Sequence, residues 1–211
     1  MPASTIAPTA PGTSVVQPGW LRATHWLNAL SVVLMIASGW RIYDAAPLFG
    51  LHFPKALTLG GWLGGALQWH FAAMWLLVAN GILYLTLNLA TGRFARRFFP
   101  LRAAAIRHDL AAALRGRLSH ADLSHYNALQ RAAYLCAIAD LGLLVVSGLV
   151  LWKSVQFPLL REAMGGYDGA RLVHFFAMAV LVCFSAIHIV MVALVPQTLR
   201  TMISTRLGGR R

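Results

Sequence analysis

The segment RLVHFFAMAVLVCFSAIHIV, residues 171–190, decides how the rest of the chain is interpreted. It is apolar enough to lie in a bilayer, yet it contains two histidines, His174 and His188. Ionisable side chains inside a membrane are costly and usually mark a function. Their separation corresponds to a rise of about 21 Å along an α-helix and a return to nearly the same face. We therefore expect two imidazoles that point the same way at two depths.

The composition around this segment is typical of an integral membrane protein. Of the 211 residues, 58% are hydrophobic and only 11% are charged, which leaves too little polar surface for a soluble domain. Four apolar stretches reach the roughly 20 residues that a bilayer core requires. They run from Trp20 to Trp40, Trp62 to Leu89, Leu129 to Trp152 and Leu172 to Val195. The expected fold is an all-α bundle of four transmembrane helices.

The net charge of +12 indicates membrane topology and not nucleic-acid binding, because the arginines lie between the apolar stretches. Most positive charges precede the first stretch, follow the fourth, or lie between the second and third. An excess of lysine and arginine marks cytoplasmic segments. We therefore expect both termini and the connection between stretches two and three on the cytoplasmic side of the membrane.

The segments outside the four stretches offer little room for a second domain. Residues 1–17 lack the features of a signal peptide and are expected to form a disordered tail, and residues 201–211 a basic cytoplasmic tail. Residues 18–200 then form one transmembrane domain. Residues 101–118 alternate apolar side chains with arginines in a pattern typical of a helix that lies on the membrane surface or is simply solvated. Cys136 and Cys183 form no metal-binding pattern and are expected to be small core residues.

Four histidines fall inside the apolar stretches, and the inferred topology gives their depths. His25 and His188 lie toward the cytoplasmic side, whereas His70 and His174 lie toward the outer side. Two neutral imidazoles on facing helices can occupy both axial positions of a haem iron. Zinc would need four ligands at one depth. The sequence therefore predicts two bis-histidine haem b sites; the alternative is that these histidines only pack against their neighbours.

Two arginines accompany these histidines. Arg22 precedes His25 by three residues, and Arg171 precedes His174 by the same interval, so each shares a helix face with its histidine. A guanidinium nearer the membrane surface suits the carboxylates of a haem propionate. The alternative is the ordinary enrichment of arginine at helix ends.

Several short motifs resemble one known family, the di-haem cytochrome b subunits of bacterial membrane-bound hydrogenases, formate dehydrogenases and thiosulfate reductases. The resemblance covers about residues 18–200. It is carried by THWLN (24–28), SGWRIY (38–43), LQWHF (67–71), YNALQRAAY (126–134) and ARLVHF (170–175). It implies the same pairing of the histidines, with His25 and His188 on the inner haem and His70 and His174 on the outer one.

The resemblance also implies a function. Such subunits pass electrons between a redox enzyme outside the membrane and quinone near the inner haem. Asn127 matches a position that lines the quinone pocket in formate dehydrogenase-type members, although Leu129 replaces a glycine found there. The motif SGWRIY is similar to members that serve periplasmic molybdopterin enzymes, so the expected partner is such an enzyme or a hydrogenase.

Two other functions stay open at this level. A stand-alone oxidoreductase similar to the short bacterial cytochromes b561, reacting quinol with an oxidant such as superoxide, would have the same histidines and no partner. A haem-free membrane anchor would use its histidines for packing alone. The chain has only six acidic residues and no catalytic triad or phosphate-binding loop, which argues against hydrolysis and phosphoryl transfer.

Overall fold

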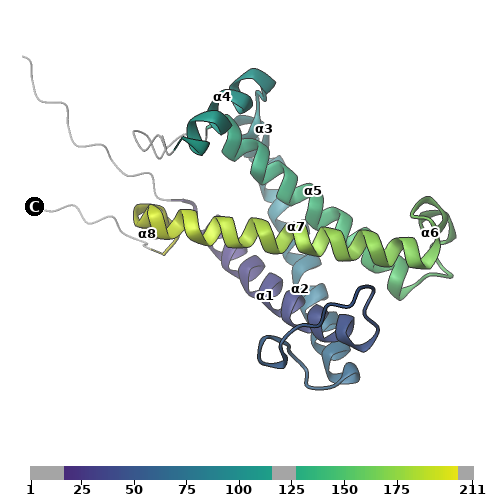
Figure 1. Ribbon diagram of the computed structural model, residues 1–211. Coiled ribbons are helices and arrows are strands. Elements are labelled where there is room, and N and C mark those ends of the chain that lie inside the picture. Colours follow the sequence, from purple (N-terminus) through teal and green to yellow (C-terminus); the bar gives the residue numbers. More distant parts are fainter. Residues whose placement is uncertain (1–16, 116–126, 204–211) are drawn as a thin grey trace, which may run out of the picture.

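The computed structural model in Figure 1 describes residues 17–115 and 127–203, and every regular element in these ranges is a helix. Four long helices dominate: α1 (Gly19–Ala45), α2 (Leu63–Ala90), α5 (Ala128–Trp152) and α7 (Gly166–Leu194). Short helices occupy the connections: η1 (Lys55–Leu57), α3 (Arg93–Phe98), α4 (Ala103–Leu114), α6 (Pro158–Ala163) and α8 (Pro196–Ile203). The all-α prediction is confirmed.

The four long helices coincide with the four apolar stretches of the sequence. By length and composition, α2, α5 and α7 are able to cross a membrane. The 27 residues of α1 are also sufficient in length, but polar side chains such as Arg22 and Asn28 lower its hydropathy. Three candidate spans are thus present among the described residues, and the four-span topology with cytoplasmic termini stays a prediction.

The long helices form two pairs, because α1 packs mainly against α2, and α5 packs mainly against α7. Small side chains let helix backbones approach closely inside a membrane, and a seven-residue spacing is typical of left-handed helix pairs. Buried residues with this spacing run along the first pair: Thr24, Ser31 and Ser38 on α1, and Ala66, Ala73 and Asn80 on α2. The second pair buries Ser147, Val150, Ala170 and Ala177.

A network of hydrogen bonds connects α1 and α2 near the start of α1. The Asn80 amide nitrogen donates to the carbonyl of Thr24 at 2.8 Å and to Asn28 Oδ1 at 2.7 Å. Such polar contacts between helices are favourable where no water competes. They hold α1 and α2 in a fixed register beside His25.

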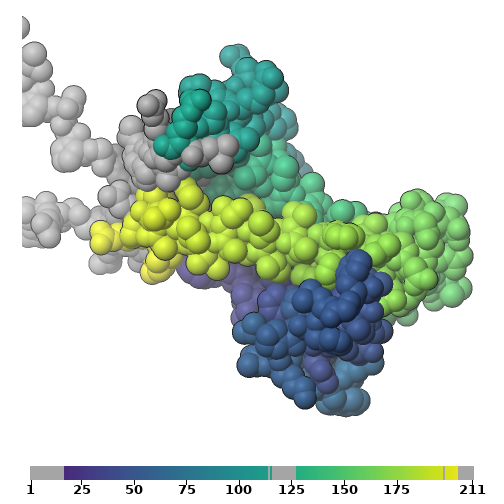
Figure 2. Space-filling model, in the orientation of Figure 1, coloured from purple at the N-terminus to yellow at the C-terminus, as the bar shows by residue number. Residues whose placement is uncertain are grey.

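Many large apolar side chains lie exposed on the long helices, and Figure 2 shows one face of the molecule that these helices form. Val33 on α1 and Ile189 on α7 are 63% and 66% exposed, whereas the buried positions hold mostly small residues. A large exposed apolar surface over a small-residue interior suits lipid surroundings.

The expectation that the two cysteines are core residues is wrong, because both are exposed. Toward the start of α5, where Cys136 lies, this helix diverges from α7 (Figure 1). Cys183 follows the buried Leu181 by two residues, a turn of about 200° on a helix, and so faces away from the α5–α7 contact.

The connection between α1 and α2 folds back over the end of α1. The amide of Leu59 donates to the Ala37 carbonyl at 2.9 Å. The Phe53 amide donates to Asp44 Oδ1 at 2.9 Å, and its ring stacks on Trp40 with centroids 4.6 Å apart. These contacts close the outer end of the first pair.

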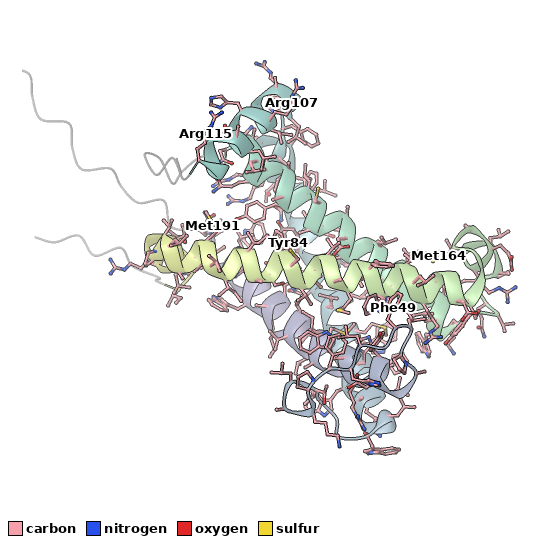
Figure 3. The ribbon with its side chains drawn as sticks, viewed as in Figure 1. Phe49, Tyr84, Arg107, Arg115, Met164 and Met191 are labelled. Carbon is pink, nitrogen blue, oxygen red and sulfur yellow. The ribbon has the colours of Figure 1, made fainter. Side chains whose placement is uncertain are left out.

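The connection between α2 and α5 contains the helix expected within residues 101–118, since α4 covers Ala103–Leu114. Arg107 and Arg115 mark this basic end of the molecule in Figure 3. Asp109 Oδ2 accepts a hydrogen bond from the Ala128 amide at 2.8 Å and thereby joins α4 to α5. Whether α4 lies on a membrane surface stays a prediction. Residues 1–16, 116–126 and 204–211, which include most of both predicted tails, lie outside the described residues.

Candidate functional site

The inner histidines, His25 on α1 and His188 on α7, face each other across the two helix pairs. Their ring centroids are 6.1 Å apart, with an angle of 64° between the planes. Two metal–imidazole bonds of about 2 Å each and two ring radii of about 1 Å each place opposing ligand rings about 6 Å apart. The observed spacing therefore fits two imidazoles that share one metal ion.

The outer histidines, His70 on α2 and His174 on α7, lie close enough to interact electrostatically. Each also contacts a serine on the neighbouring helix of its own pair. Ser38 Oγ lies 3.0 Å from His70 Nδ1, and Ser147 Oγ lies 2.9 Å from His174 Nδ1. The same contact, between a serine hydroxyl and a histidine Nδ1 atom, thus occurs once in each helix pair.

A glycine follows the serine in both arrangements and keeps the flank of the imidazole open. A Cβ atom added at Gly39 would lie 3.4 Å from His70 Cε1, and one added at Gly148 would lie 3.4 Å from His174 Cε1. Gly39 attracts notice in the sequence as a small residue, but the serines do not. The repeated Ser-Gly dipeptide is the signal that could have found them.

The structure thus brings the four histidines together in the combinations obtained by counting depth. Because α7 provides one imidazole to each pair, both pairs bridge α1–α2 and α5–α7. Among the described residues, no group of three or more His, Cys, Asp or Glu side chains is placed to hold a metal ion. Two imidazoles alone suit an iron whose other ligands come from a porphyrin ring, and they do not suit a structural zinc.

Two buried donors near the outer pair also fit a group with carboxylates. Trp40 Nε1 and Arg41 Nε have no hydrogen bond partner among the described residues. Both residues directly follow Ser38 and Gly39 on α1. Buried polar groups are normally satisfied, and a propionate carboxylate would satisfy these donors. Sequence reasoning missed both residues in this role, although they stand within the motif SGWRIY.

The two arginines that the sequence offered for the propionates lie on the expected helices. Arg171 donates to the Ala46 carbonyl at 2.5 Å and lies 3.7 Å from Asp168 Oδ1, so it fastens α7 to the end of α1. Arg22 is half-buried on α1, one helical turn before His25. Their role toward a cofactor stays a prediction.

Asn127 caps helix α5. Its Oδ1 accepts from the Gln130 amide at 2.7 Å, while the Gln130 side chain accepts from the Asn127 amide at 3.2 Å. This reciprocal pair is a capping box. Asn127 and Gln130 together cap the start of α5, and the contact of Asn127 with quinone stays a prediction.

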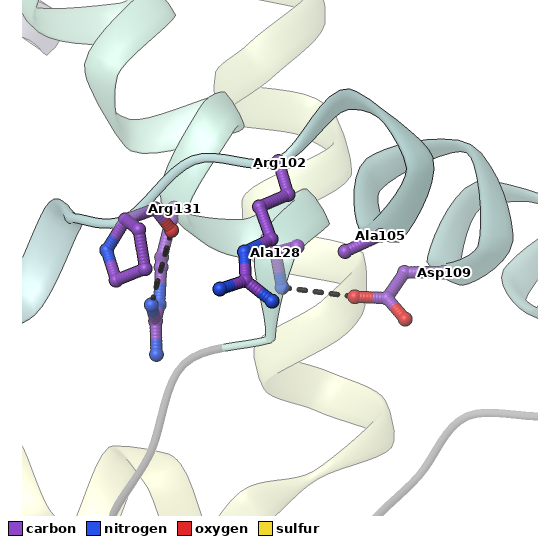
Figure 4. Close-up of a pocket in the computed structure, with 6 residues that line it drawn as sticks. Arg102, Ala105, Asp109, Ala128 and Arg131 are labelled. Atoms are coloured by element: carbon purple, nitrogen blue, oxygen red, sulfur yellow. Dashed lines mark hydrogen bonds between the residues drawn. The ribbon is translucent and has the colours of Figure 1, made fainter.

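An open hollow of about 380 Å³ lies beside this cap. Figure 4 shows its lining, in which Arg102 and Arg131 flank the start of α5 and Asp109 bonds to Ala128. Asn127 directly precedes Ala128, which lines the hollow, but Asn127 itself is not among the lining residues. Tyr126, which precedes Asn127 in the motif YNALQRAAY, lies outside the described residues.

Comparison with known proteins agrees with these features. A family model described as prokaryotic cytochrome b561 matches residues 16–205. A relative from Azospira oryzae is 64% identical over 188 residues, which cover 89% of this chain and 95% of the relative. That relative is named "Putative protein-methionine-sulfoxide reductase subunit YedZ1".

The two matches span nearly the whole chain and accord with its apolar helices. The protein is accordingly a multi-pass protein of the bacterial inner membrane. Its paired histidines on long apolar helices are of the kind that a membrane cytochrome requires. On this evidence the chain belongs to the prokaryotic cytochrome b561 family of haem b-containing electron-transfer proteins.

Proposed function

We propose that this protein is the membrane subunit of a periplasmic reductase and contains two b haems, each bound by two histidines. His70 and His174 bind the outer haem, and His25 and His188 bind the inner one. The observation that carries the proposal is the approach of the four histidines in two pairs. The ring centroids of His25 and His188 lie 6.1 Å apart, and His70 and His174 lie close enough to interact electrostatically. A haem held by these histidines would supply reversible one-electron transfer.

The helices keep the two sites at fixed depths. His174 and His188 are on one rigid helix, about 21 Å apart along its axis, so a single element sets the separation of the sites. The imidazoles would provide the metal ligands, and Trp40 and Arg41 would donate hydrogen bonds to the carboxylates of the outer haem. The exposed apolar side chains keep the assembly in lipid, which makes transfer across the membrane the task that this arrangement suits.

The relative from Azospira oryzae supports the choice of partner, because its name describes a subunit of a protein-methionine-sulfoxide reductase. Reduction of a sulfoxide to a thioether consumes two electrons and two protons and releases water. Oxidation of a quinol to a quinone releases the same numbers. We therefore propose that electrons pass outward, from quinol to a periplasmic enzyme that reduces methionine sulfoxide. A molybdopterin enzyme is the type of partner that the motifs favour.

The proposed site of quinol oxidation is on the cytoplasmic side, near the inner histidines. Asn127 is the residue proposed to contact quinone, on the strength of the motif YNALQ. In the structure Asn127 lies at the start of α5, beside the open hollow lined by Arg102 and Arg131.

The stand-alone quinol oxidoreductase differs from this proposal in needing no partner. The description of the relative as a subunit favours the partnered function. The test is to reduce the purified protein with a quinol and then to record haem reoxidation optically. Reoxidation only when a periplasmic reductase and a sulfoxide are both present supports the proposal. Rapid reoxidation by superoxide alone, at an unchanged rate with the reductase, contradicts it.

A further inference from the structure

The serines beside the outer histidines each have one hydroxyl hydrogen, and the structure shows where it goes. Ser38 Oγ lies 2.6 Å from the Leu34 carbonyl oxygen, and Ser147 Oγ lies 2.7 Å from that of Leu143. A carbonyl oxygen can only accept, so each hydroxyl donates to the preceding turn of its own helix. At the contact with Nδ1, the serine oxygen is therefore the acceptor, and the histidine nitrogen carries the hydrogen.

Burial isolates these contacts from water. Ser38 and Ser147 are both 0% exposed, so water does not compete for these groups. A histidine with its hydrogen on Nδ1 keeps a free lone pair on Nε2, the nitrogen that can then bind a metal.

We propose that Ser38 and Ser147 are positioning residues that hold His70 and His174 in the Nδ1–H form, with both Nε2 atoms ready to bind one iron. The identity of the iron group rests on the proposed function, whereas the assigned tautomer does not. A hydrogen bond at the second nitrogen also makes a ligating imidazole more basic. The outer iron is thereby stabilised in its oxidised form.

The inner pair provides an internal reference for this proposal. Within the described residues, His25 and His188 contact aromatic rings and each other, and their rings have no serine partner. Loss of a serine hydroxyl should therefore change the outer haem and leave the inner haem as it is.

The chain also offers matched controls. Ser31 is 0% exposed on α1 and donates to the Leu27 carbonyl at 2.8 Å, as Ser38 does to Leu34, but it contacts no described histidine. On α7, Ser185 donates to the Leu181 carbonyl at 2.8 Å. Replacing either serine with alanine removes a hydroxyl of the same type and leaves the proposed serine–histidine contacts in place.

The experiment compares Ser38→Ala and Ser147→Ala with Ser31→Ala and Ser185→Ala in the full-length protein. The midpoint potential of each haem and the rate of haem loss to an acceptor protein are measured. Since loss of such a partner commonly costs about 10–100-fold in metal affinity, we expect outer haem retention to fall by a factor of that order. In Ser38→Ala and Ser147→Ala the midpoint potential of the outer haem should rise, and that of the inner haem should stay constant. Ser38→Thr should restore the midpoint potential of the outer haem.

The tautomer is read separately, from the ¹⁵N shifts of His70 and His174 in haem-free protein, assigned with His→Ala variants. A hydrogen on Nδ1 in the wild type, lost in Ser38→Ala, supports the inference even if the chain binds no haem and the proposed function fails. A hydrogen on Nε2 in the wild type overturns it. Equal shifts of the outer potential in Ser31→Ala and Ser38→Ala also overturn it, while a normal two-haem spectrum would leave the proposed function standing.

Discussion

The outer and inner histidine pairs are held in different ways. At the outer pair, each imidazole is bonded to a buried serine at 3.0 Å or 2.9 Å, and a glycine leaves its flank open. At the inner pair, His188 stacks on Phe184 at 6.0 Å, and the edge of Trp26 meets His25 at 5.5 Å. The outer rings are thus oriented by hydrogen bonds and the inner rings by aromatic packing. Different substitutions should therefore disrupt haem binding at each pair.

Removal of an imidazole should have the largest effect. His70→Ala and His174→Ala should each lose the outer haem and retain the inner one, because each variant removes one of the two proposed iron ligands of the outer site only. His25→Ala and His188→Ala should lose the inner haem. Haem content and reduced-minus-oxidised spectra of the four variants check this. The pairing is refuted if His70→Ala and His188→Ala lose the same haem.

Filling the open flank of the outer pair should have the next largest effect. Gly148→Val places two methyl groups beyond a Cβ that already lies 3.4 Å from His174 Cε1, so the ring must move. Loss of the outer haem with retention of the inner one is expected in the optical spectrum. Gly142→Val is the control on the same helix, since no atom lies within 4 Å of an added Cβ there. Equal haem loss in both variants would count against the open flank.

Removal of a ring at the inner pair should have a moderate effect. Phe184→Leu deletes the side chain that stacks on His188 with an interplanar angle of 10°. Such a ring pair contributes ~0.5–1.5 kcal/mol, so inner haem affinity should fall by up to about tenfold. Haem transfer to an acceptor protein measures this. Phe71→Leu, which alters a ring that packs on Trp152, is the control. A loss confined to the outer haem would contradict the division between the pairs.

The smallest effect is expected at the α5 cap. Asn127→Ala removes the side chain that accepts from Gln130 and should lower stability by about 1 kcal/mol, while Asn127→Ser keeps a capping oxygen and should restore it. Thermal unfolding measures this part. Under the proposed contact with quinone, quinol oxidation should be impaired in both variants. If serine restores turnover together with stability, Asn127 is only a cap.

Much of the fold could be predicted from the sequence, because the apolar length of a stretch and the rise of a helix are local properties. They predict the four long helices and, through the depths of His174 and His188, which histidines meet. The exposure of Cys136 and Cys183 could not be predicted in this way. It depends on how far α5 diverges from α7 and on which face of α7 is covered.

The parts of the candidate site that sequence reasoning missed depend on the rotation of one helix against another. Ser38 contacts His70, and Ser147 contacts His174, only because each helix pair turns these faces together. The buried nitrogens Trp40 Nε1 and Arg41 Nε, which have no hydrogen bond partner among the described residues, can likewise be identified only once burial is known. The Ser-Gly dipeptide beside each outer histidine is the one trace of this arrangement in the sequence.

The most direct test of the central claim is haem quantitation combined with a redox titration of the purified wild-type chain. The account predicts two low-spin b haems per chain, which titrate as separate components because their histidines have different surroundings. A chain with no haem, or with a single haem that survives both His70→Ala and His188→Ala, would contradict it.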